Sequence, residues 1–496
     1  FLRQTNCMTP NLVTAGNFNI TNTNELFEEL ISLGQFPKER SDTVTMMEKI
    51  GHFLDAEVQE LFEQYKHEGL NNKDISERIA ENLDLTKVLT RSFKKVDGGY
   101  AMLGMIGTGD AFVVRDPNGI RPAYYYEDDE VVVVASERPA IQTAFGVRYK
   151  NVKEVPPAHA LIVRRDGQLV IHPFAEVAPR KACSFEHIYF SRGNDRTIYL
   201  ERKLLGRTLA EPILKAVNYD FENTVFAYIP NTAETAFYGM VDGLDYLLDQ
   251  HKKERILELG TEVNAQKLSN ILKARVRTEK LIVKDAKIRT FIADTASRGD
   301  LVAHVYDVTY GIVRNGEDTL VLLDDSIVRG TTLRDSILSI VARLFPKKVI
   351  IVSSAPQIRY PDCYGIDMSV MKSFVAFQAL IALLHKDDKA SMISDCYDKC
   401  KAQQNKPKEE IVNHVKELYA LYSDKQISDE IAQIVKPKNL TFEVEVVYQT
   451  IDGLHKACKD NTGDWYFSGD YPTPGGNKVV NQAFINYYEN SSDRAY

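Results

Sequence analysis

The sequence lacks the features of a secreted or membrane protein. Six cysteines in 496 residues are too few for a disulfide framework, which favours a reducing cytoplasm. We find no apolar run near the length of about 18 residues that a spanning helix needs, and no basic-then-apolar leader. We therefore expect a cytoplasmic protein that contacts no membrane.

The sequence also lacks an excess of positive charge. Its formal net charge is −8, which argues against a surface for nucleic acid or another polyanion. The lysine-bearing loop G-x-x-x-x-G-K-[ST] of nucleotide hydrolases is absent as well. Any recognition of phosphate should therefore be local and of another kind.

What is present is an ordinary globular composition, with 44% hydrophobic and 26% charged residues. The length allows two or three domains. Residues 1–180 alternate strand-like runs at 111–116 and 130–137 with helical stretches such as 24–34, and turn-rich segments such as 116–122 lie between them. This pattern predicts a layered α+β domain.

The rest of the chain divides into two regions. Residues 184–385 hold isolated β-branched runs at 224–230, 318–325 and 347–356, with helical stretches between them. Such runs are typical of strands covered on both faces, and they predict a doubly wound parallel sheet. Residues 386–496 begin with a charged, helix-periodic stretch, so we expect a helical insertion and a C-terminal extension that pack on the second domain.

The segment 321–333, VLLDDSIVRGTTL, carries the clearest chemical signal. Ligands of open α/β sheets collect outside the carboxyl ends of the strands, where Asp324 and Asp325 would lie. The turn 326–332 can wrap an anion with backbone N–H groups and threonine hydroxyls, ahead of a helix over 333–344. The carboxylates suit sugar hydroxyls, Mg²⁺ or a shared proton. A sugar phosphate satisfies both halves, whereas the alternative is a simple capped helix after a strand.

In this segment and others, the sequence resembles the amidophosphoribosyltransferase family. VLLDDSIVRGTTLRDSI looks like the phosphoribosyl pyrophosphate (PRPP) signature of type I phosphoribosyltransferases, in the form that this family uses. The resemblance covers nearly the whole chain and weakens between about 386 and 435. Further matching segments follow in the family's order: RDPNGIRP (115–122), VASE (134–137), FEHIYFSRGND (185–195), IRTFI (288–292) and SSAPQIRYPDCYGIDMS (353–369).

The resemblance implies a fold and a reaction. The fold is an N-terminal nucleophile glutaminase domain of layered α+β type, here truncated, followed by a type I phosphoribosyltransferase domain with a doubly wound sheet. Family members hydrolyse glutamine in the first domain and pass ammonia to the second, where it displaces pyrophosphate from PRPP. The product, 5-phosphoribosylamine, begins purine synthesis. The resemblance also implies Mg²⁺, inhibition by purine nucleotides, and a homodimer or homotetramer.

Individual residues receive roles from the same resemblance. Asp324 and Asp325 would hold the ribose hydroxyls and Mg²⁺, and the following turn would hold the 5-phosphate. Arg289 matches the arginine of a mobile loop that closes over PRPP and excludes water. The residues assigned to PRPP in the turn are Ser326, Val328, Arg329, Gly330, Thr331 and Thr332.

The glutamine site departs from the family pattern. The family's nucleophile is an N-terminal cysteine, whereas residue 1 here is Phe, so we expect the chain to begin inside the glutaminase domain. Gly16 matches one donor of the oxyanion hole, but Ala15 stands where an asparagine usually supplies the second donor. Asp42 matches the carboxylate that binds the glutamine α-amine, or else it belongs to a helix cap.

The second domain departs from the pattern at the pyrophosphate end. Ala233 replaces a serine expected near Mg²⁺. The cation-rich stretch that normally follows the mobile loop is replaced by residues 298–311. Pyrophosphate should therefore meet fewer cations than in the family.

Some relatives carry a four-cysteine iron–sulfur cluster. Cys183 falls at one ligand position, and Cys363 lies one position away from the second. The remaining two ligand positions fall at Gly463 and Tyr466. We therefore predict no iron–sulfur cluster.

Three hypotheses follow. The first is an amidophosphoribosyltransferase that uses glutamine or free ammonia. The second is a phosphoribosyltransferase that joins PRPP to a different amine or base. The third is a non-catalytic homologue that senses PRPP or binds a partner. The intact PRPP signature and the order of the motifs favour the first, whereas the altered pyrophosphate loop favours the third.

Overall fold

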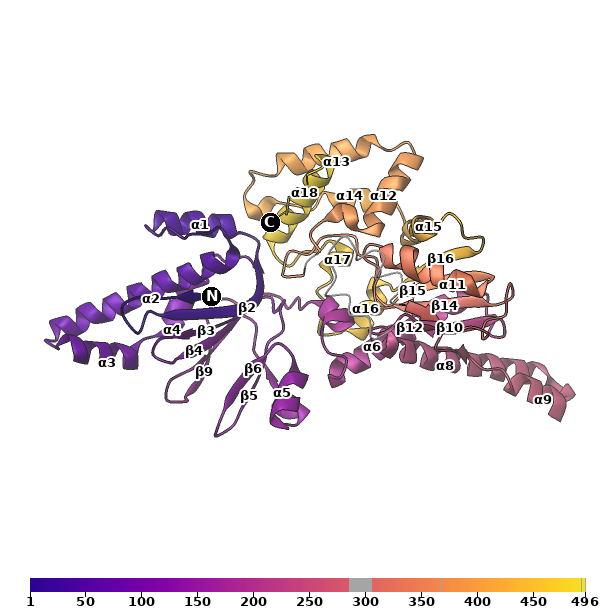
Figure 1. Ribbon diagram of the computed structural model, residues 1–496, viewed down its shortest axis with the longest axis horizontal. Helices are drawn as coiled ribbons and strands as arrows, with labels where there is room; N and C mark the ends of the chain where they lie inside the picture. Colours follow the sequence, from indigo (N-terminus) through magenta and orange to yellow (C-terminus); the bar gives the residue numbers. More distant parts are fainter. Residues whose placement is uncertain (285–305, 367, 492, 496) are drawn as a thin grey trace.

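The computed structural model describes residues 1–284, 306–366, 368–491 and 493–495. Two domains lie side by side, the first in indigo and purple and the second in magenta to yellow (Figure 1). Arg289, expected in the mobile loop, lies outside the described residues.

The first domain is built on a six-stranded antiparallel sheet in the order β1-β2-β3-β4-β8-β9. Met102 and Val114 point from this sheet into a buried core with Met46 and Ile50 of helix α2 and Leu89 of α4. Burial of these apolar side chains holds the helices on that face. The elements are β1 (Leu2–Arg3), β2 (Leu12–Ile20), β3 (Gly98–Ile106), β4 (Ala111–Arg115), β8 (His159–Val163), β9 (Leu169–Pro173), α1 (Thr23–Ser32), α2 (Asp42–His67), α3 (Asn72–Asn82) and α4 (Leu85–Ser92).

Part of the other face is covered by a small antiparallel sheet in the order β6-β5-β7. Val113 and Leu161 of the large sheet pack there against Tyr125 of the small one. The layered α+β arrangement is confirmed, and the strands expected at 111–116 and 130–137 are present as β4 and β6. The added elements are β5 (Tyr124–Glu127), β6 (Val132–Ala135), β7 (Lys153–Glu154) and α5 (Arg138–Phe145).

The second domain is built on a five-stranded parallel sheet in the order β11-β10-β14-β15-β16. In the central strand β14, Leu320 and Leu322 join one buried core, and Val321 and Leu323 join the core on the opposite face. The doubly wound prediction is therefore confirmed, since helices cover both faces. The strands are β10 (Thr224–Tyr228), β11 (Arg277–Thr278), β14 (Thr319–Asp324), β15 (Lys348–Ser353) and β16 (Glu443–Tyr448), beside a hairpin of β12 (Ile282–Lys284) and β13 (Tyr306–Val308).

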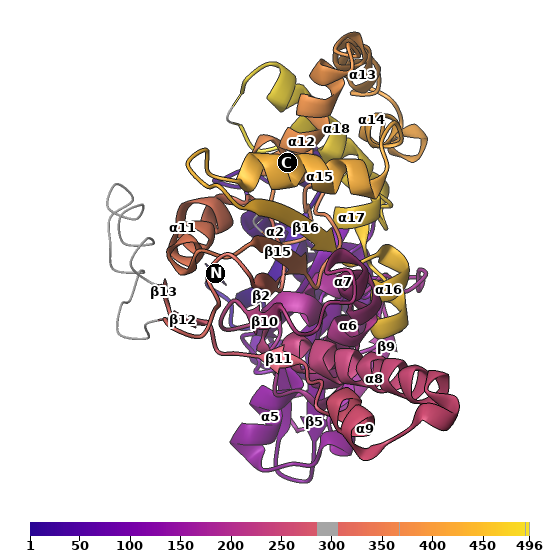
Figure 2. The ribbon, with the colours of Figure 1, turned by 90° about the vertical axis from the view of Figure 1, so that its right-hand side faces the viewer.

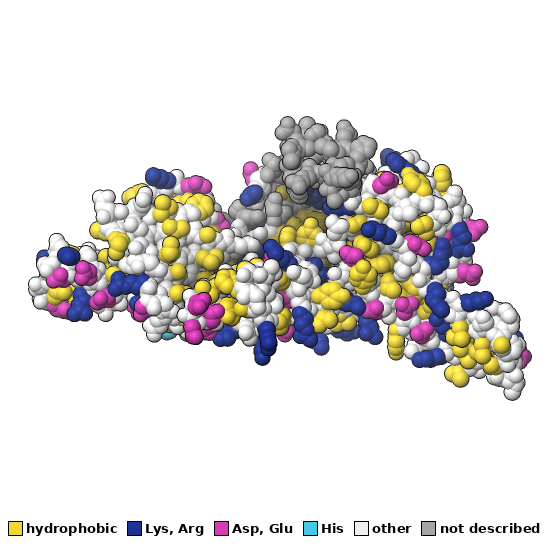
Figure 3. Space-filling view, turned by 60° about the horizontal axis from the view of Figure 1, so that its bottom comes forward, with side chains coloured by type: hydrophobic (Ala, Val, Ile, Leu, Met, Phe, Trp, Pro, Cys, Tyr) yellow, Lys and Arg dark blue, Asp and Glu magenta, His cyan; other side chains and the backbone are white. Residues whose placement is uncertain are grey.

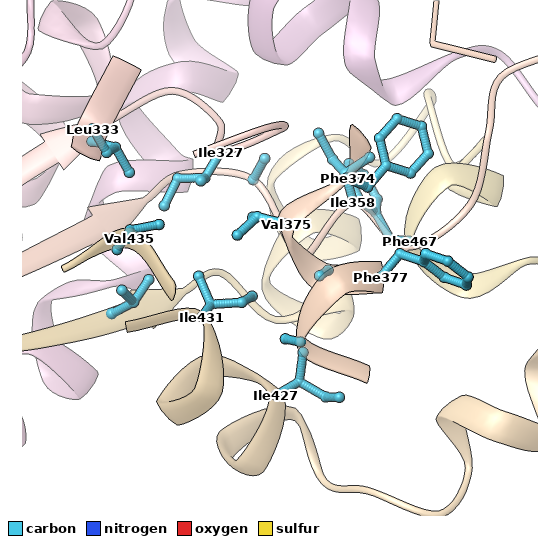
Figure 4. Packing of buried hydrophobic residues seen from close by; sticks show 14 of the residues in the cluster. Ile327, Leu333, Ile358, Phe374, Val375, Phe377, Ile427, Ile431, Val435 and Phe467 are labelled. Atoms are coloured by element: carbon cyan, nitrogen blue, oxygen red, sulfur yellow. The ribbon is translucent and has the colours of Figure 1, made fainter. Parts of the chain in front are cut away.

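Helices α7 and α8 cover one face of this sheet, and the other face packs against α12 and α15. In Figure 4 the turn residues Ile327 and Leu333 point toward Val375 of α12 and toward Ile431 and Val435 of α15. Both ends of the 326–332 turn are thus fixed in the apolar core. The helices are α6 (Arg196–Thr208), α7 (Ala210–Ala216), α8 (Glu234–Glu258), α9 (Ala265–Leu272), α11 (Leu338–Val341) and α12 (Val375–Lys386).

The C-terminal region adds both helices and a strand. Cys396, Cys400 and Ile427 of its helices are buried in the core that contains β14 and β15. Strand β16, which the sequence pattern did not predict, pairs in parallel with β15 at the edge of the sheet (Figure 2). The helices of this region are α13 (Ser391–Ala402), α14 (Val415–Tyr419), α15 (Asp424–Val435), α16 (Ile451–Ala457), α17 (Trp465–Ser468) and α18 (Pro474–Tyr488).

Hydrogen bonds join the two domains directly. Asp97 of the first domain accepts a hydrogen bond from the Thr473 hydroxyl at 2.5 Å and one from the Gly475 backbone N–H at 3.2 Å. The Asn19 side-chain amide donates to the carbonyl of Cys363 at 2.7 Å. The start of α18 and the segment after β15 are therefore both attached to the first domain.

The surface carries charge of both signs. Lysine and arginine side chains are interspersed with aspartate and glutamate over the face in Figure 3. Among the described parts of the chain, no helix is both long enough and apolar enough to cross a bilayer.

The stability of the fold should depend on pH through Asp318, which is fully buried just before β14. Burial alone would raise the pKa of this carboxyl, but hydrogen bonds from Arg277 at 2.8 Å and Arg314 at 2.7 Å outweigh burial and lower the pKa to about 2. A folded-state pKa below the ordinary value of about 4 stabilises the fold fully at neutral pH, and this stabilisation is lost as pH falls from about 4 to 2. Asp318→Asn should lower the free energy of unfolding by on the order of 1 to 2 kcal/mol at pH 7.

Urea denaturation at pH 7 and at pH 3 measures this effect. The difference between wild type and Asp318→Asn should shrink at the lower pH. Glu317→Gln is the matched control, because Glu317 is the exposed neighbour in the sequence. An equal loss for both variants would contradict the assignment.

Candidate functional site

A pocket of about 600 Å³ opens at the carboxyl ends of the parallel strands. This is the edge at which open α/β sheets bind ligands. All eight residues that the resemblance assigns to PRPP in the second domain line it. They are Asp324, Asp325, Ser326, Val328, Arg329, Gly330, Thr331 and Thr332.

The two aspartates are held in place by backbone and hydroxyl contacts. The Asp325 N–H donates to the Asp324 carboxylate at 2.9 Å, and the Ser326 hydroxyl donates to the Asp325 carboxylate at 2.9 Å. Ser354, which follows β15, donates its N–H to the Asp324 carbonyl at 2.9 Å and its hydroxyl to the Asp325 carbonyl at 3.1 Å. The orientation of the pair is therefore fixed by its own strand and the neighbouring strand.

The charge of this pair is not neutralised by a salt bridge within the described residues. Burial, with the neighbouring charge of Asp325, raises the pKa of Asp324 well above its usual value. Burial also raises the pKa of Asp325 to about 6, although the Ser326 hydroxyl and the charge of Arg202 oppose that rise. Two neighbouring, half-buried carboxylates repel each other when both are ionised. A bound cation or ribose hydroxyls would relieve this repulsion.

Mg²⁺ fits the donors that are present. It prefers oxygen ligands and is commonly held by one or two carboxylates with substrate phosphates completing its coordination. In the part of the chain that the structure describes, no cluster of three or more histidine, cysteine, aspartate or glutamate side chains could hold a metal by itself. Asp324 and Asp325 would therefore share the ion with the substrate.

The turn after the aspartates is shaped by close packing. Gly330 has φ of +71°, and a Cβ there would lie 2.8 Å from Val435 and 3.3 Å from Val375. Only glycine satisfies both the backbone angle and this contact. The hydroxyls of Thr331 and Thr332 are exposed at the far end of the turn, where an anion can reach them.

The opposite wall contains residues that the sequence analysis did not assign to the site. Tyr189 and Phe190 come from a π-helical turn over Glu186–Phe190. Lys284 ends β12 and Tyr306 begins β13, and the Lys284 ammonium lies 5.8 Å from the centre of the Tyr306 ring. Burial and the charges of the two aspartates raise the pKa of Tyr306. The signal for Tyr189 was present within FEHIYFSR, whereas Lys284 and Tyr306 flank the expected mobile loop.

The loop after β10 places one hydroxyl residue in the pocket. Ala233, noted as replacing a serine, is fully buried. Thr232, the residue before it, lines the pocket, and its side chain lowers the pKa of Asp325 against the effect of burial.

The residues assigned to glutamine lie in the first domain on different elements. Gly16 is in β2, where a Cβ would approach the Ala101 carbonyl of β3 to 2.6 Å, so close packing alone requires glycine. Asp42 is the first residue of α2, but Ser41 makes the cap by accepting from the Val44 N–H. Within the described residues no hydrogen bond or ion pair joins Gly16 to Asp42.

The positions compared with cluster ligands are partly brought together. The Cys183 thiol lies 2.9 Å from the Tyr466 hydroxyl, and Cys183 and Gly463 form a backbone bridge. Cys363 is buried, and the structure describes it as a free thiol. Burial raises the pKa of Cys183 and Cys363, so both are neutral at physiological pH.

Comparison with known proteins gives matches in both domains. A glutamine amidotransferase domain model matches residues 55–143. The amidophosphoribosyltransferase of Pasteurella multocida is 25% identical over 377 residues, which cover 74% of this chain and 64% of that protein. The Pseudomonas aeruginosa enzyme is 30% identical over 290 residues, or 56% of this chain and 50% of that protein. The chain thus spans between half and two thirds of the length of these relatives.

Solved structures extend the likeness to the whole fold. The glutamine PRPP amidotransferase of Bacillus subtilis, complexed with ADP and GMP, matches with a TM-score of 0.58 and 23% identity over 95% of this chain and 79% of that chain. A structure described as the allosteric regulatory enzyme of purine biosynthesis gives a TM-score of 0.61 at 23% identity, with 95% of this chain and 78% of that chain covered. The chain is therefore related to the amidophosphoribosyltransferases and shares their two-domain fold.

Proposed function

We propose that this protein is an amidophosphoribosyltransferase, which converts PRPP and ammonia, supplied free or from glutamine, to 5-phosphoribosylamine and pyrophosphate. The observation that carries the proposal is the pocket at the sheet edge. It combines an adjacent carboxylate pair with a glycine-shaped, hydroxyl-rich turn, as a sugar phosphate with a metal ion requires.

Each part of the pocket has a role in this reaction. The turn from Ser326 to Thr332 binds the 5-phosphate through backbone N–H groups and hydroxyls. Asp324 and Asp325 orient the ribose hydroxyls and hold Mg²⁺, which when bound supplies positive charge for the departing pyrophosphate. Arg289, from the family's mobile loop, would close over the substrate. Catalysis then rests on positioning and charge neutralisation, because displacement at the anomeric carbon requires no covalent help from the protein.

A connecting segment supports delivery of ammonia from the first domain. Its Cys363 carbonyl accepts the hydrogen bond from Asn19 of the first domain, and Ile366 and Met368 line the PRPP pocket. Asp362 fixes its shape by accepting from the N–H groups of Tyr364 at 3.0 Å and Ile366 at 2.6 Å. One short stretch thus reaches from the first domain to the second site.

The remaining assignments belong to the same proposal. Gly16 and Asp42 would serve glutamine in a domain over residues 1–180, with transferase chemistry in 184–385 and the 386–496 region packed against it. The similar Bacillus subtilis enzyme is complexed with ADP and GMP, and the other solved relative is described as an allosteric regulatory enzyme, which supports purine nucleotides as inhibitors. A cytoplasmic homodimer or homotetramer follows from the family likeness.

One observation favours the alternative of a PRPP-binding protein without catalysis. Among the described residues that line the pocket, only Lys284 and Arg329 are cationic. Pyrophosphate would meet little protein charge unless residues outside the described ranges contribute. Transfer to a different amine or base is the remaining alternative, and a panel of acceptors separates it from ammonia transfer.

Pyrophosphate release tests the proposed function directly. The chain with PRPP, Mg²⁺ and ammonium at about pH 8 should release pyrophosphate, and a coupled assay measures the rate. Asp324→Asn should reduce kcat/KM by about 10²-fold or more, because an aligned charge contact to substrate and metal is lost. PRPP binding without release by any acceptor would support the sensor instead.

Asp325→Asn separates function from stability. The raised pKa means that the ionised carboxyl destabilises the fold above about pH 6, and this penalty disappears below about pH 4. At pH 7 the free energy of unfolding of the variant should exceed that of the wild type by on the order of 1 to 2 kcal/mol, with a higher melting temperature, while PRPP binding weakens. Calorimetry at pH 7 and pH 4 measures both. A lower melting temperature at pH 7 would refute the assigned electrostatic cost.

Binding of Mg²⁺ with PRPP should depend on pH through the same pair. Because the pKa of Asp325 is raised to about 6, protons compete with the metal below that pH. Affinity measured by titration calorimetry should be constant above about pH 7 and fall by roughly tenfold per unit below about pH 6. An affinity independent of pH between 5 and 8 would contradict metal binding at this pair.

A further inference from the structure

The aromatic wall of the pocket is held by its backbone. Tyr189 and Phe190 are 43% and 47% exposed, so burial of their side chains does not fix them. They belong to the π-helical turn Glu186–Phe190, which closes with the Ser191 N–H donating to the Glu186 carbonyl at 2.8 Å. What holds this turn therefore decides where the wall stands.

Arg202 of α6 holds the turn from the second domain. Its guanidinium donates to the carbonyls of His187 at 2.8 Å, Tyr189 at 3.1 Å and Ser191 at 2.7 Å. Arg202 is only 5% exposed. One planar group thus holds the carbonyls of every second residue from 187 to 191, and this fixes the backbone conformation of the turn.

Arg121 of the first domain holds the same turn from the other side. Its Nη2 lies 2.9 Å from the Glu186 carboxylate, and the two side chains are 4% and 9% exposed. The other carboxylate oxygen of Glu186 accepts from the Ser191 hydroxyl at 3.2 Å. The charge pair thus ties both ends of the turn to a residue outside the second domain.

Arg121 is itself fixed in position. Its N–H donates to buried Asp116 at 3.1 Å, and its carbonyl accepts from the Arg115 guanidinium at 2.7 Å. This segment is the RDPNGIRP motif. It is also hydrogen-bonded to Cys183, whose N–H donates to the Ile120 carbonyl at 3.2 Å. A displacement of the motif would therefore be passed to Glu186 rather than absorbed.

We propose that Arg121 is a positioning residue that couples the first domain to the transferase pocket, by holding Glu186 and hence the Tyr189–Phe190 wall in place. This rests on the proposed function, in that the wall is taken to border bound PRPP. Arg121 does not line the pocket, and it acts through the turn. A merely structural ion pair would change stability when broken and leave the substrate KM unchanged.

A double-mutant cycle on Arg121 and Glu186 tests the coupling. With ammonia as acceptor, Arg121→Gln and Glu186→Gln should each raise the KM for PRPP by about tenfold with kcat changed less than threefold. The double variant should raise the KM no further than either single change, because one contact is lost in all three. Arg180→Gln is the matched control. Arg180 also reaches across the domain junction, where its guanidinium donates to the Asp460 carbonyl at 3.0 Å, and it does not touch the turn.

Removing one partner of a buried pair can prevent folding. Arg202→Lys provides a second test, because it keeps the charge and loses the planar three-carbonyl contact; it should raise the KM for PRPP in the same way. A wild-type KM in Arg121→Gln, or multiplied effects in the double variant, would overturn the proposal. So would an unchanged KM in Arg202→Lys.

Equilibrium binding of PRPP with Mg²⁺ separates this proposal from the proposed function. If the wild type binds PRPP but releases no pyrophosphate, the proposed function fails. The positioning role is then tested by comparing the dissociation constants of the variants and the wild type for PRPP. Arg121→Gln should weaken binding by about tenfold and Arg180→Gln by less than twofold. Equal binding by wild type and Arg121→Gln would overturn the positioning role alone.

Discussion

The adjacent carboxylates of Asp324 and Asp325 impose the main constraint on the second domain. Two like charges at the end of a central strand are unfavourable, and burial raises the pKa of both. Contacts from Ser326, and from Ser354 just after the neighbouring strand, hold the pair in place despite this repulsion. None of these contacts neutralises the charge. The surrounding strands, turn and helices therefore hold two carboxylates whose charge is not neutralised. Such a pair is suited to bind a cation together with a sugar phosphate.

The junction between the domains converges on the same pocket. Asn19 reaches the segment that continues to Ile366, and Arg121 reaches the turn that carries Tyr189. A third contact, from Asp97 to the start of α18, fixes the C-terminal helix to the first domain. The first two of these contacts thus end on segments that line the site, whereas others across the junction, such as the pair of Arg138 and Asp195 at 2.7 Å, do not. The first domain consequently acts on the transferase pocket through backbone position, and no side chain of the first domain is among the described residues that line it.

Local patterns in the sequence predicted what local physics determines. The strand that ends at Asp324 and the turn through Gly330 lie within one short stretch of sequence, so this part of the pocket lining was predictable. Strand β16 was not, because EVEVVY alternates glutamate with valine at the edge of a sheet and follows a helical region. Lys284 and Tyr306 were missed for a different reason. They line the pocket beside each other only after β12 pairs with β13, and no spacing in the sequence shows that pairing.

The loop after β10 shows how burial bears on a substitution. Ala233 occupies the position where the family has a serine, which suggested that a hydroxyl near the metal had been lost. In the fold, residue 233 is buried and does not line the pocket, whereas Thr232 beside it does. The substitution therefore removes a hydroxyl from a position that does not face the pocket here. Among the described residues that line the pocket, the cations are Lys284 and Arg329, which come from separate elements. Under the proposed function, a metal held at Asp324 and Asp325 would therefore supply positive charge that the departing pyrophosphate needs.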